Sequence, residues 1–221
     1  MNRKIGFTKT YHENLFKGDD SISGMGSNLR NTQVLRQRLV EFFKQYNIKT
    51  LIDAPCGDVW WMKEILKLQF FTQYIGIDIV DELITKNIAR YATDHVQFYC
   101  LDIVDSFPTQ NADVLLCRDC LVHLSYESAF KVLEHFSKSN IDYILLTTFT
   151  NRERQNNNFS DVFNWYPMNL QKYPFNLPMP EYVINEECPE CNGEYRDKSL
   201  ALWSRREIAS HVSVWRNQCG I

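Results

Sequence analysis

The sequence predicts an α/β fold with a doubly wound, mainly parallel sheet of seven strands that ends in an antiparallel C-terminal hairpin. Three observations support this prediction. Five apolar runs alternate with helical patterns between residues 50 and 149. A turn containing Gly57 follows the first run, and Asp78 ends the second run about 20 residues later, the spacing of nucleotide-binding sheets.

The first 30 residues show little periodicity, and residues 21–28 are predicted to form an irregular segment that leads into a helix. A helix is predicted over residues 31–46, because Leu35, Leu39, Phe42 and Tyr46 fall on one face. Residues 1–47 are therefore expected to form an N-terminal lid and helix.

The first strand is predicted at residues 50–52, a turn at 53–57, and then a helix with Trp61, Ile65 and Leu68 on one face. Gly57 would let a ligand approach the backbone closely. Asp53 and Asp58 would repel a pyrophosphate but not a cationic nucleoside that carries an amino acid. The turn also lacks G-x-G-x-x-G, so an NAD site loses its main support.

Further elements follow in order. We predict strands at residues 74–80, 96–100, 113–119 and 141–149, and helices at 81–91 and after Ser125, a favoured N-cap residue. A hairpin of 182–185 with 199–204 and a helix at 205–212 close the chain. Residues 151–180 are rich in aromatic residues and proline and are predicted to form a substrate-side loop, since long loops in compact domains are usually functional.

Three motifs carry a family resemblance: D-A-P-C-G-D at Asp53–Asp58, C-R-D-C-L-V-H-L at Cys117–Leu124, and D-K-S-L-A-L-W at Asp197–Trp203. With them the sequence resembles the class I S-adenosylmethionine-dependent methyltransferases, and more narrowly a bacterial subfamily often associated with surface-glycan and capsule biosynthesis. The resemblance implies a seven-stranded Rossmann-like methyltransferase sheet and S-adenosyl-L-methionine as cofactor.

The resemblance also implies a cofactor cradle. Asp78 is the expected acceptor for ribose hydroxyls, and Asp102 either accepts the adenine amino group or caps the next turn. The remaining residues expected at the cofactor are Asp53, Ala54, Pro55, Gly57, Asp58, Trp61, Ile79, Ile103 and Arg118. The segment around Ser27 either closes over the cofactor or substrate, or is a flexible leader.

Methyl transfer to oxygen needs a base, and histidine has a pKa near the operating pH. His123 follows the fourth strand, where the family places substrate-facing residues, so it is predicted to be the general base; the alternative is a packed structural histidine. Asp119 is the second candidate base or orients His123. Arg118 either binds an anionic substrate or pairs with a carboxylate.

Other predicted substrate contacts are Ser27, Trp165, Tyr173 and Lys198, each with a packing role as the alternative. The pairs Cys117/Cys120 and Cys188/Cys191 have zinc-like spacing within each pair. The gap between the pairs is too long for a zinc ribbon, so no metal site is predicted.

The composition predicts one soluble domain over residues 1–221, with 44% hydrophobic residues. A net charge of −3 disfavours nucleic acid as a partner. Seven cysteines and the lack of a signal-peptide pattern indicate a reduced cytoplasmic setting without a membrane partner. We expect a monomer or homodimer.

The predicted function is an O-methyltransferase for a small polar acceptor, phosphorylated or sugar-linked, such as a nucleotide-linked sugar or phosphoramidate capsule precursor. Alternatives are an N-methyltransferase, a nucleic-acid methyltransferase and a non-catalytic S-adenosylmethionine-binding module.

Overall fold

The computed structural model describes residues 2–151, 153–162 and 165–219, which contain a seven-stranded sheet in the order β3-β2-β1-β4-β5-β7-β6. The first five strands pair in parallel, whereas β7 runs antiparallel to both β5 and β6. This arrangement confirms the predicted fold class. The strands are β1 Thr50–Asp53, β2 Gln73–Asp78, β3 Val96–Cys100, β4 Ala112–Cys117, β5 Ile141–Phe149, β6 Tyr182–Asn185 and β7 Lys198–Ser204.

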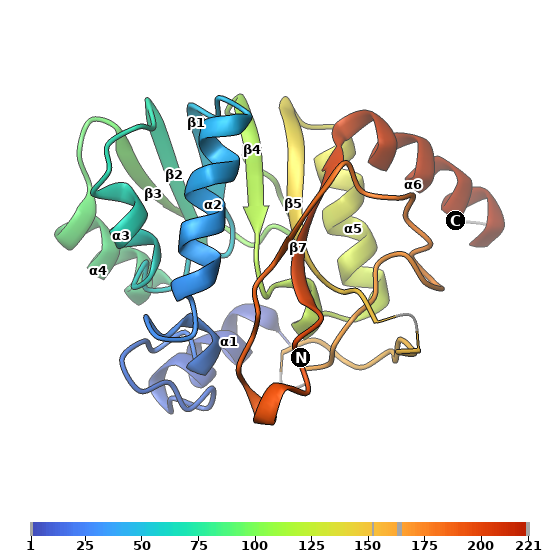
Figure 1. Ribbon diagram of the computed structural model, residues 1–221, viewed down its shortest axis with the longest axis horizontal. Helices are drawn as coiled ribbons and strands as arrows, with labels where there is room; N and C mark the ends of the chain where they lie inside the picture. The colour runs from blue at the N-terminus through green and yellow to red at the C-terminus, as the bar shows by residue number, and fades with distance from the viewer. Residues whose placement is uncertain (1, 152, 163–164, 220–221) are drawn as a thin grey trace.

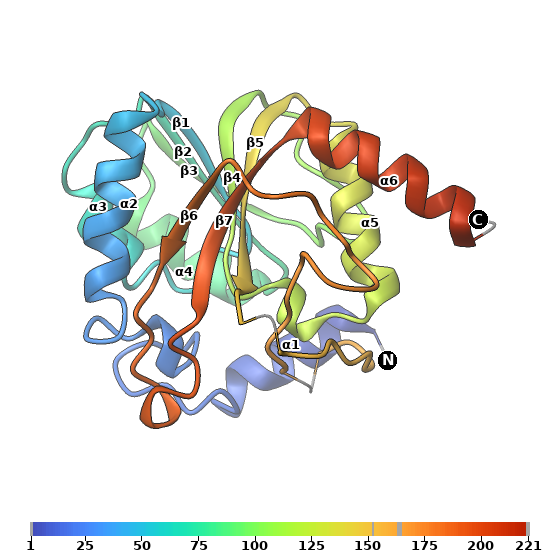
Figure 2. The same ribbon diagram turned by 45° about the vertical axis from the view of Figure 1, so that its right-hand side comes forward.

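Helices cover both faces of the sheet (Figure 2). One face carries α2 and α3, and the other carries α5 and α6, while α1 lies across the end of the sheet at which the parallel strands finish (Figure 1). The described α-helices are α1 Arg3–His12, α2 Gln33–Gln45, α3 Met62–Leu66, α4 Asp81–Tyr91, α5 Tyr126–Ser137 and α6 Arg205–Cys219.

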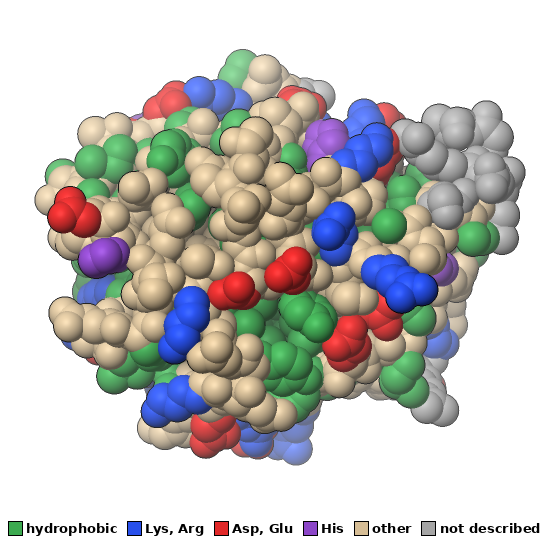
Figure 3. Space-filling view, turned by 90° about the horizontal axis from the view of Figure 1, so that it is seen from above, with side chains coloured by type: hydrophobic (Ala, Val, Ile, Leu, Met, Phe, Trp, Pro, Cys, Tyr) green, Lys and Arg blue, Asp and Glu red, His purple; other side chains and the backbone are tan. Residues whose placement is uncertain are grey.

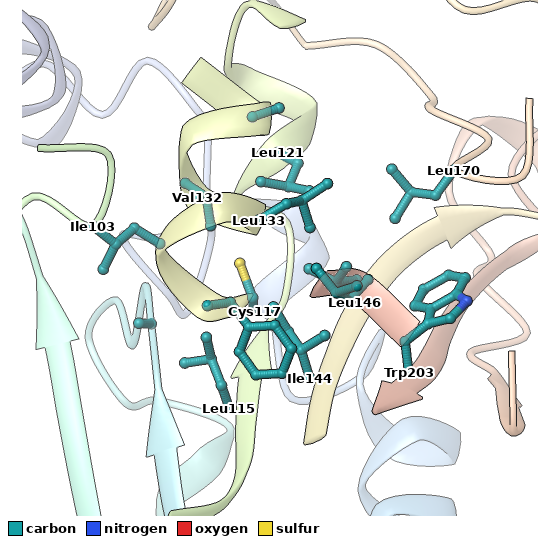
Figure 4. Close-up of a cluster of buried hydrophobic side chains, with 14 of the residues drawn as sticks. Ile103, Leu115, Cys117, Leu121, Val132, Leu133, Ile144, Leu146, Leu170 and Trp203 are labelled. Carbon is teal, nitrogen blue, oxygen red and sulfur yellow. The ribbon is translucent and has the colours of Figure 1, made fainter. Parts of the chain in front are cut away.

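Alternating residues of the strands belong to two apolar cores, one on each face of the sheet. On the α5 side, Val132 and Leu133 of the helix belong to one core cluster with Cys117 of β4 and Leu146 of β5 (Figure 4). Burying each large aliphatic side chain contributes roughly 1.5–3 kcal/mol. Trp203 is fully buried in the same core, and its indole N–H donates to the Pro178 carbonyl at 2.9 Å.

Residues 21–28 hold only the short 3₁₀ helix Met25–Ser27 and are otherwise irregular, as predicted. Helix α1 was not predicted. Its N-cap Asn2 accepts a hydrogen bond from the Ile5 N–H at 3.2 Å. Ile5 itself is 67% exposed, so the helix lacks the broad buried apolar face that periodicity detects.

Other boundaries also differ from the sequence predictions. The helix after the first turn begins only at Met62, because the backbone from Cys56 to Val59 forms a turn in which Val59 has a φ of 59°. Leu68 lies beyond that helix and is 54% exposed. The final helix continues to Cys219 instead of ending at Val212.

The substrate-side loop holds no helix or strand among its described residues, and residues 152, 163 and 164 lie outside that part of the chain. Met168, Leu170 and Phe175 of this loop are buried in the α5-side core. At the end of the molecule away from α1, acidic and basic side chains are interspersed (Figure 3). None of the described helices is long and apolar enough to cross a membrane.

Candidate active site

A cavity of about 170 Å³ lies at the carboxyl ends of four neighbouring strands, β3, β2, β1 and β4. Residues of α1 and of the segment that follows it close one side of the cavity. Ligands of open α/β sheets bind at this edge. The lining contains every residue predicted at the cofactor: Asp53, Ala54, Pro55, Gly57, Asp58, Trp61, Asp78, Ile79, Asp102, Ile103 and Arg118. Ser27, Asp119 and His123 line it as well.

Asp53 ends β1 and is only 2% exposed. Its Oδ2 accepts a hydrogen bond from the Tyr74 hydroxyl at 2.7 Å. Burial raises the pKa of Asp53 to about 7, against the lowering effects of the Tyr74 hydrogen bond and of Arg118. A carboxylate in this position gains from any positive charge that enters the cavity.

Asp78 ends β2 and fixes the neighbouring turn. Its two oxygens accept hydrogen bonds from the backbone N–H groups of Gly57 and Val80, each at 3.1 Å. Burial raises the pKa of Asp78 to about 6 even though these N–H groups favour the charged form. Each carboxylate oxygen still has a second lone pair, so Asp78 can also accept from ligand hydroxyls.

Gly57 has a φ of 54°, in the left-handed region that favours glycine. A Cβ at this position would lie 2.3 Å from the Ser23 hydroxyl. The side chain of Asp58 fastens the same N-terminal segment, because it accepts from the Ser21 hydroxyl and the Ile22 N–H, both at 3.0 Å. Asp58 therefore holds the segment over the turn as well as lining the cavity.

Asp102 follows the carboxyl end of β3 and also lines the cavity. One oxygen accepts from the Val104 N–H at 2.9 Å, the turn contact expected of an Asp cap. The other accepts from Arg3 Nε at 2.8 Å, so α1 is ion-paired to this end of the cavity. Arg3 also lies 3.3 Å from Asp161 of the substrate-side loop.

Four charged side chains form a buried group beside the cavity, which we term the charge quartet: Arg118, Asp119, Glu186 and Lys198. Arg118 makes a two-pronged contact with Glu186, at 3.1 Å from Nε and 2.7 Å from Nη2. Lys198 Nζ donates to Asp119 Oδ2 at 2.6 Å. Arg118 also donates to the Gly26 carbonyl at 2.8 Å, which ties the N-terminal segment to β4.

Asp119 has a φ of 51°, and its N–H donates to the Thr147 hydroxyl at 2.8 Å. Burial opposes ionisation, but Lys198 and Arg118 outweigh it and lower the pKa of Asp119 to about 2. Asp119 is therefore a carboxylate at every physiological pH and a weak general base.

His123 ends a short 3₁₀ turn, Leu121–His123, after β4. Its ring packs against Phe16 with centroids 4.8 Å apart and against the edge of Phe7 at 6.3 Å. Both phenylalanines belong to the N-terminal segment, and they hold the imidazole at the cavity wall.

Trp165 and Tyr173 are not brought to the cavity lining. The ring centroids of Trp165 and Tyr195 lie 4.8 Å apart, and Tyr173 is 79% exposed.

Four residues at the site were not predicted from the sequence: Arg3, Phe7, Phe16 and Glu186. Asn2, a favoured N-cap residue, was the signal that could have indicated the helix carrying Arg3 and Phe7. Cys117 is a buried core residue, and among the described residues no cluster of three or more His, Cys, Asp or Glu side chains could hold a metal ion.

Comparisons with known proteins agree with this geometry. Residues 52–140 match a family model described as "Methyltransferase domain". Phosphoethanolamine N-methyltransferase 1 of Haemonchus contortus superposes with a TM-score of 0.59 at 14% identity, over 98% of this chain and 54% of that chain. The chain has the Rossmann-like methyltransferase fold.

Two other solved structures have TM-scores of 0.53. A putative S-adenosylmethionine-dependent methyltransferase of Listeria monocytogenes is 15% identical and covers 78% of this chain and 98% of its own. The N-methyltransferase NodS of Bradyrhizobium japonicum WM9, solved with S-adenosylhomocysteine, is 10% identical over 65% and 74%. No curated protein matches the chain. The family match and the fold together support an S-adenosylmethionine-dependent methyltransferase in general and agree with the predicted cofactor.

Proposed function

We propose that the chain is an S-adenosylmethionine-dependent O-methyltransferase that acts on a small polar acceptor, with His123 as general base. One observation carries the proposal: a single cavity has carboxylates from three neighbouring strand ends at one side and His123 with Asp119 at another. The surface-glycan precursor and the cytoplasmic location are part of this proposal and rest on the resemblance and the composition.

The residues fit the proposed cofactor on two grounds. The buried carboxyls of Asp53 and Asp78 have raised pKa values, so a sulfonium cation would stabilise their charged forms. Ile79 and Ile103 give the cavity an apolar wall that suits the flat nucleobase of the proposed cofactor.

The cofactor supplies an activated methyl group that leaves a neutral thioether behind. The protein then has to hold the acceptor oxygen in line with that methyl group, exclude water and remove one proton. In our proposal His123 takes the hydroxyl proton, Asp119 stabilises the imidazolium through its negative charge, and Phe7 and Phe16 cover the ring.

The test combines calorimetric titration of S-adenosylmethionine and S-adenosylhomocysteine with transfer of labelled methyl groups to a cytosolic extract of the host. His123→Asn is expected to lower turnover by roughly 10²–10⁴-fold while donor affinity stays within twofold. His95→Asn, an exposed histidine outside the cavity lining, is the matched control and is expected to keep full turnover.

Unchanged turnover in His123→Asn would remove the base assignment. Donor uptake without any labelled product would favour the non-catalytic binding module instead, and no donor uptake would end the proposal altogether.

A further inference from the structure

The charges around the cavity select against an anionic acceptor. The described lining holds five carboxyl side chains and two guanidinium groups. Both guanidinium groups are already ion-paired, Arg3 with Asp102 and Arg118 with Glu186. Lys198, close behind the lining, pairs with Asp119 and lies 3.6 Å from Glu186. A phosphate could recruit Arg118 or Lys198 only by breaking a buried ion pair, which is strongly unfavourable.

Among the buried side-chain atoms of the described cavity lining, one acceptor has no hydrogen-bond partner. Asp119 Oδ1 is enclosed and accepts no hydrogen bond from the residues that the structure describes, whereas Oδ2 contacts both Lys198 and Arg118. Buried polar atoms nearly always have partners, so this oxygen is suited to a donor from a ligand. The Asp119 side chain lines the cavity and keeps 22% of its surface exposed.

The quartet also fixes where that oxygen can be. Thr147 holds the Asp119 backbone, and Lys198 and Arg118 hold Oδ2, at 2.6 Å and 3.2 Å. With Glu186 included, the two cations and two anions of the quartet cancel in charge. What the quartet offers to a ligand is therefore a rigid hydrogen-bond acceptor, not an anion-binding site.

We infer that the methyl acceptor is an amino alcohol or amino sugar, whose ammonium group binds Asp119 while its neighbouring hydroxyl faces His123. This inference rests on the proposed function, because it names the substrate class of the same cavity. Arg118 and Glu186 are positioning residues in this scheme, since they act on the ligand only through Asp119 and the N-terminal segment. A phosphate beside the accepting hydroxyl is excluded by the same arrangement.

The experiment first titrates S-adenosylhomocysteine into the protein and then titrates three probes of one skeleton into that complex: glucosamine, glucose and glucose 6-phosphate. We expect glucosamine to bind at least tenfold more tightly than glucose, and the phosphate ester to bind least. Because Asp119 stays ionised whereas the amine of glucosamine loses its proton near the pKa of an α-amino group, about 7.7–8.0, the preference is expected to be strongest at pH 6 and to weaken towards pH 8.

Asp119→Asn is expected to reduce glucosamine binding at least tenfold and to leave glucose binding within twofold. Asp142→Asn, an exposed carboxyl on β5, is the control and is expected to change neither. Retained S-adenosylhomocysteine binding shows that the variant is folded. If the complex forms but glucosamine shows no advantage over glucose, or glucose 6-phosphate binds best, the inference is overturned; failure of the first titration contradicts the proposed function instead.

Discussion

At the scale of single residues, two buried carboxyls of the cavity favour ligand binding but lower the stability of the folded state at neutral pH. Asp53 and Asp78 are buried carboxyls with raised pKa values, and neither forms an ion pair within 4 Å among the described residues. A folded-state pKa above the ordinary value of about 3.9 means that the folded state holds the proton more tightly than the unfolded chain. The contribution of this proton to the stability of the folded state is complete below about pH 4, and it is lost as the pH rises through the folded-state pKa.

Asp53→Asn tests this at the residue with the larger shift. The wild type loses the stability contributed by the Asp53 proton between about pH 4 and about pH 7. The variant is therefore expected to be more stable than the wild type at pH 8, by on the order of 1–3 kcal/mol. The same change is expected to weaken S-adenosylmethionine binding at least tenfold, because it removes a negative charge from the cavity in which, in our proposal, the sulfonium cation would be held.

Urea unfolding at pH 5 and pH 8 measures the first effect and calorimetry the second. Asp94→Asn, an exposed carboxyl before β3, is the matched control and is expected to change neither quantity. A variant that is less stable at pH 8, or that binds the donor as well as the wild type does, contradicts this account of Asp53.

At the scale of elements, sequence predicted the parts whose signal is local. The strand ending at Asp53, the turn at Gly57 and the strand ending at Asp78 were predictable, since apolar runs and a glycine turn report on their own neighbourhood. Glu186 was not predictable, because only the antiparallel return of β7 brings the end of β6 to Arg118, 68 residues away along the chain. Helix α1 was missed because it lines a cavity and does not bury a broad apolar face in either core.

The N-terminal segment gives the next prediction. Phe16 packs on the His123 ring, so Phe16→Ala is expected to leave the imidazole free to reorient and to lower kcat by about tenfold, since small misplacements of a catalytic group are costly. The neighbouring side chain of Leu15 is 42% exposed, and Leu15→Ala is expected to keep kcat within twofold.

Steady-state kinetics with labelled donor separates these outcomes, and the thermal midpoint of both variants serves as the check on folding. Equal kcat values for Phe16→Ala and the wild type would show that α1 and its following segment do not position His123.

At the scale of the whole molecule, the charge quartet joins parts of the chain that are distant in sequence. Gly26 belongs to the N-terminal segment, Arg118 and Asp119 follow β4, Glu186 follows β6, and Lys198 begins β7. The antiparallel end of the sheet is thereby connected to the cover of the cavity. Apolar burial alone would leave the height of that cover above the cavity undetermined, because the hydrophobic effect is non-directional.

Glu186→Gln tests this connection. The change removes the carboxylate that makes the two-pronged contact with the buried guanidinium of Arg118 and leaves Asp119 as its ion-pair partner, and breaking a buried pair from one side costs about 3–5 kcal/mol. We expect a loss of that size in urea unfolding at pH 7. Glu127→Gln, in the exposed pair with Lys131 on α5, is the control, and exposed helix pairs contribute only about 0.3–0.5 kcal/mol.

The double variant Arg118→Met with Glu186→Leu separates charge from packing. It removes both members of the pair and leaves Asp119 with Lys198, so its stability is expected to recover most of the loss, since apolar replacements of buried pairs are often neutral. Its donor affinity is expected to be lower than that of the wild type, because Gly26 no longer has the hydrogen bond that Arg118 donates. If the double variant is stable and binds the donor as tightly as the wild type does, the quartet serves the core and not the cover of the cavity.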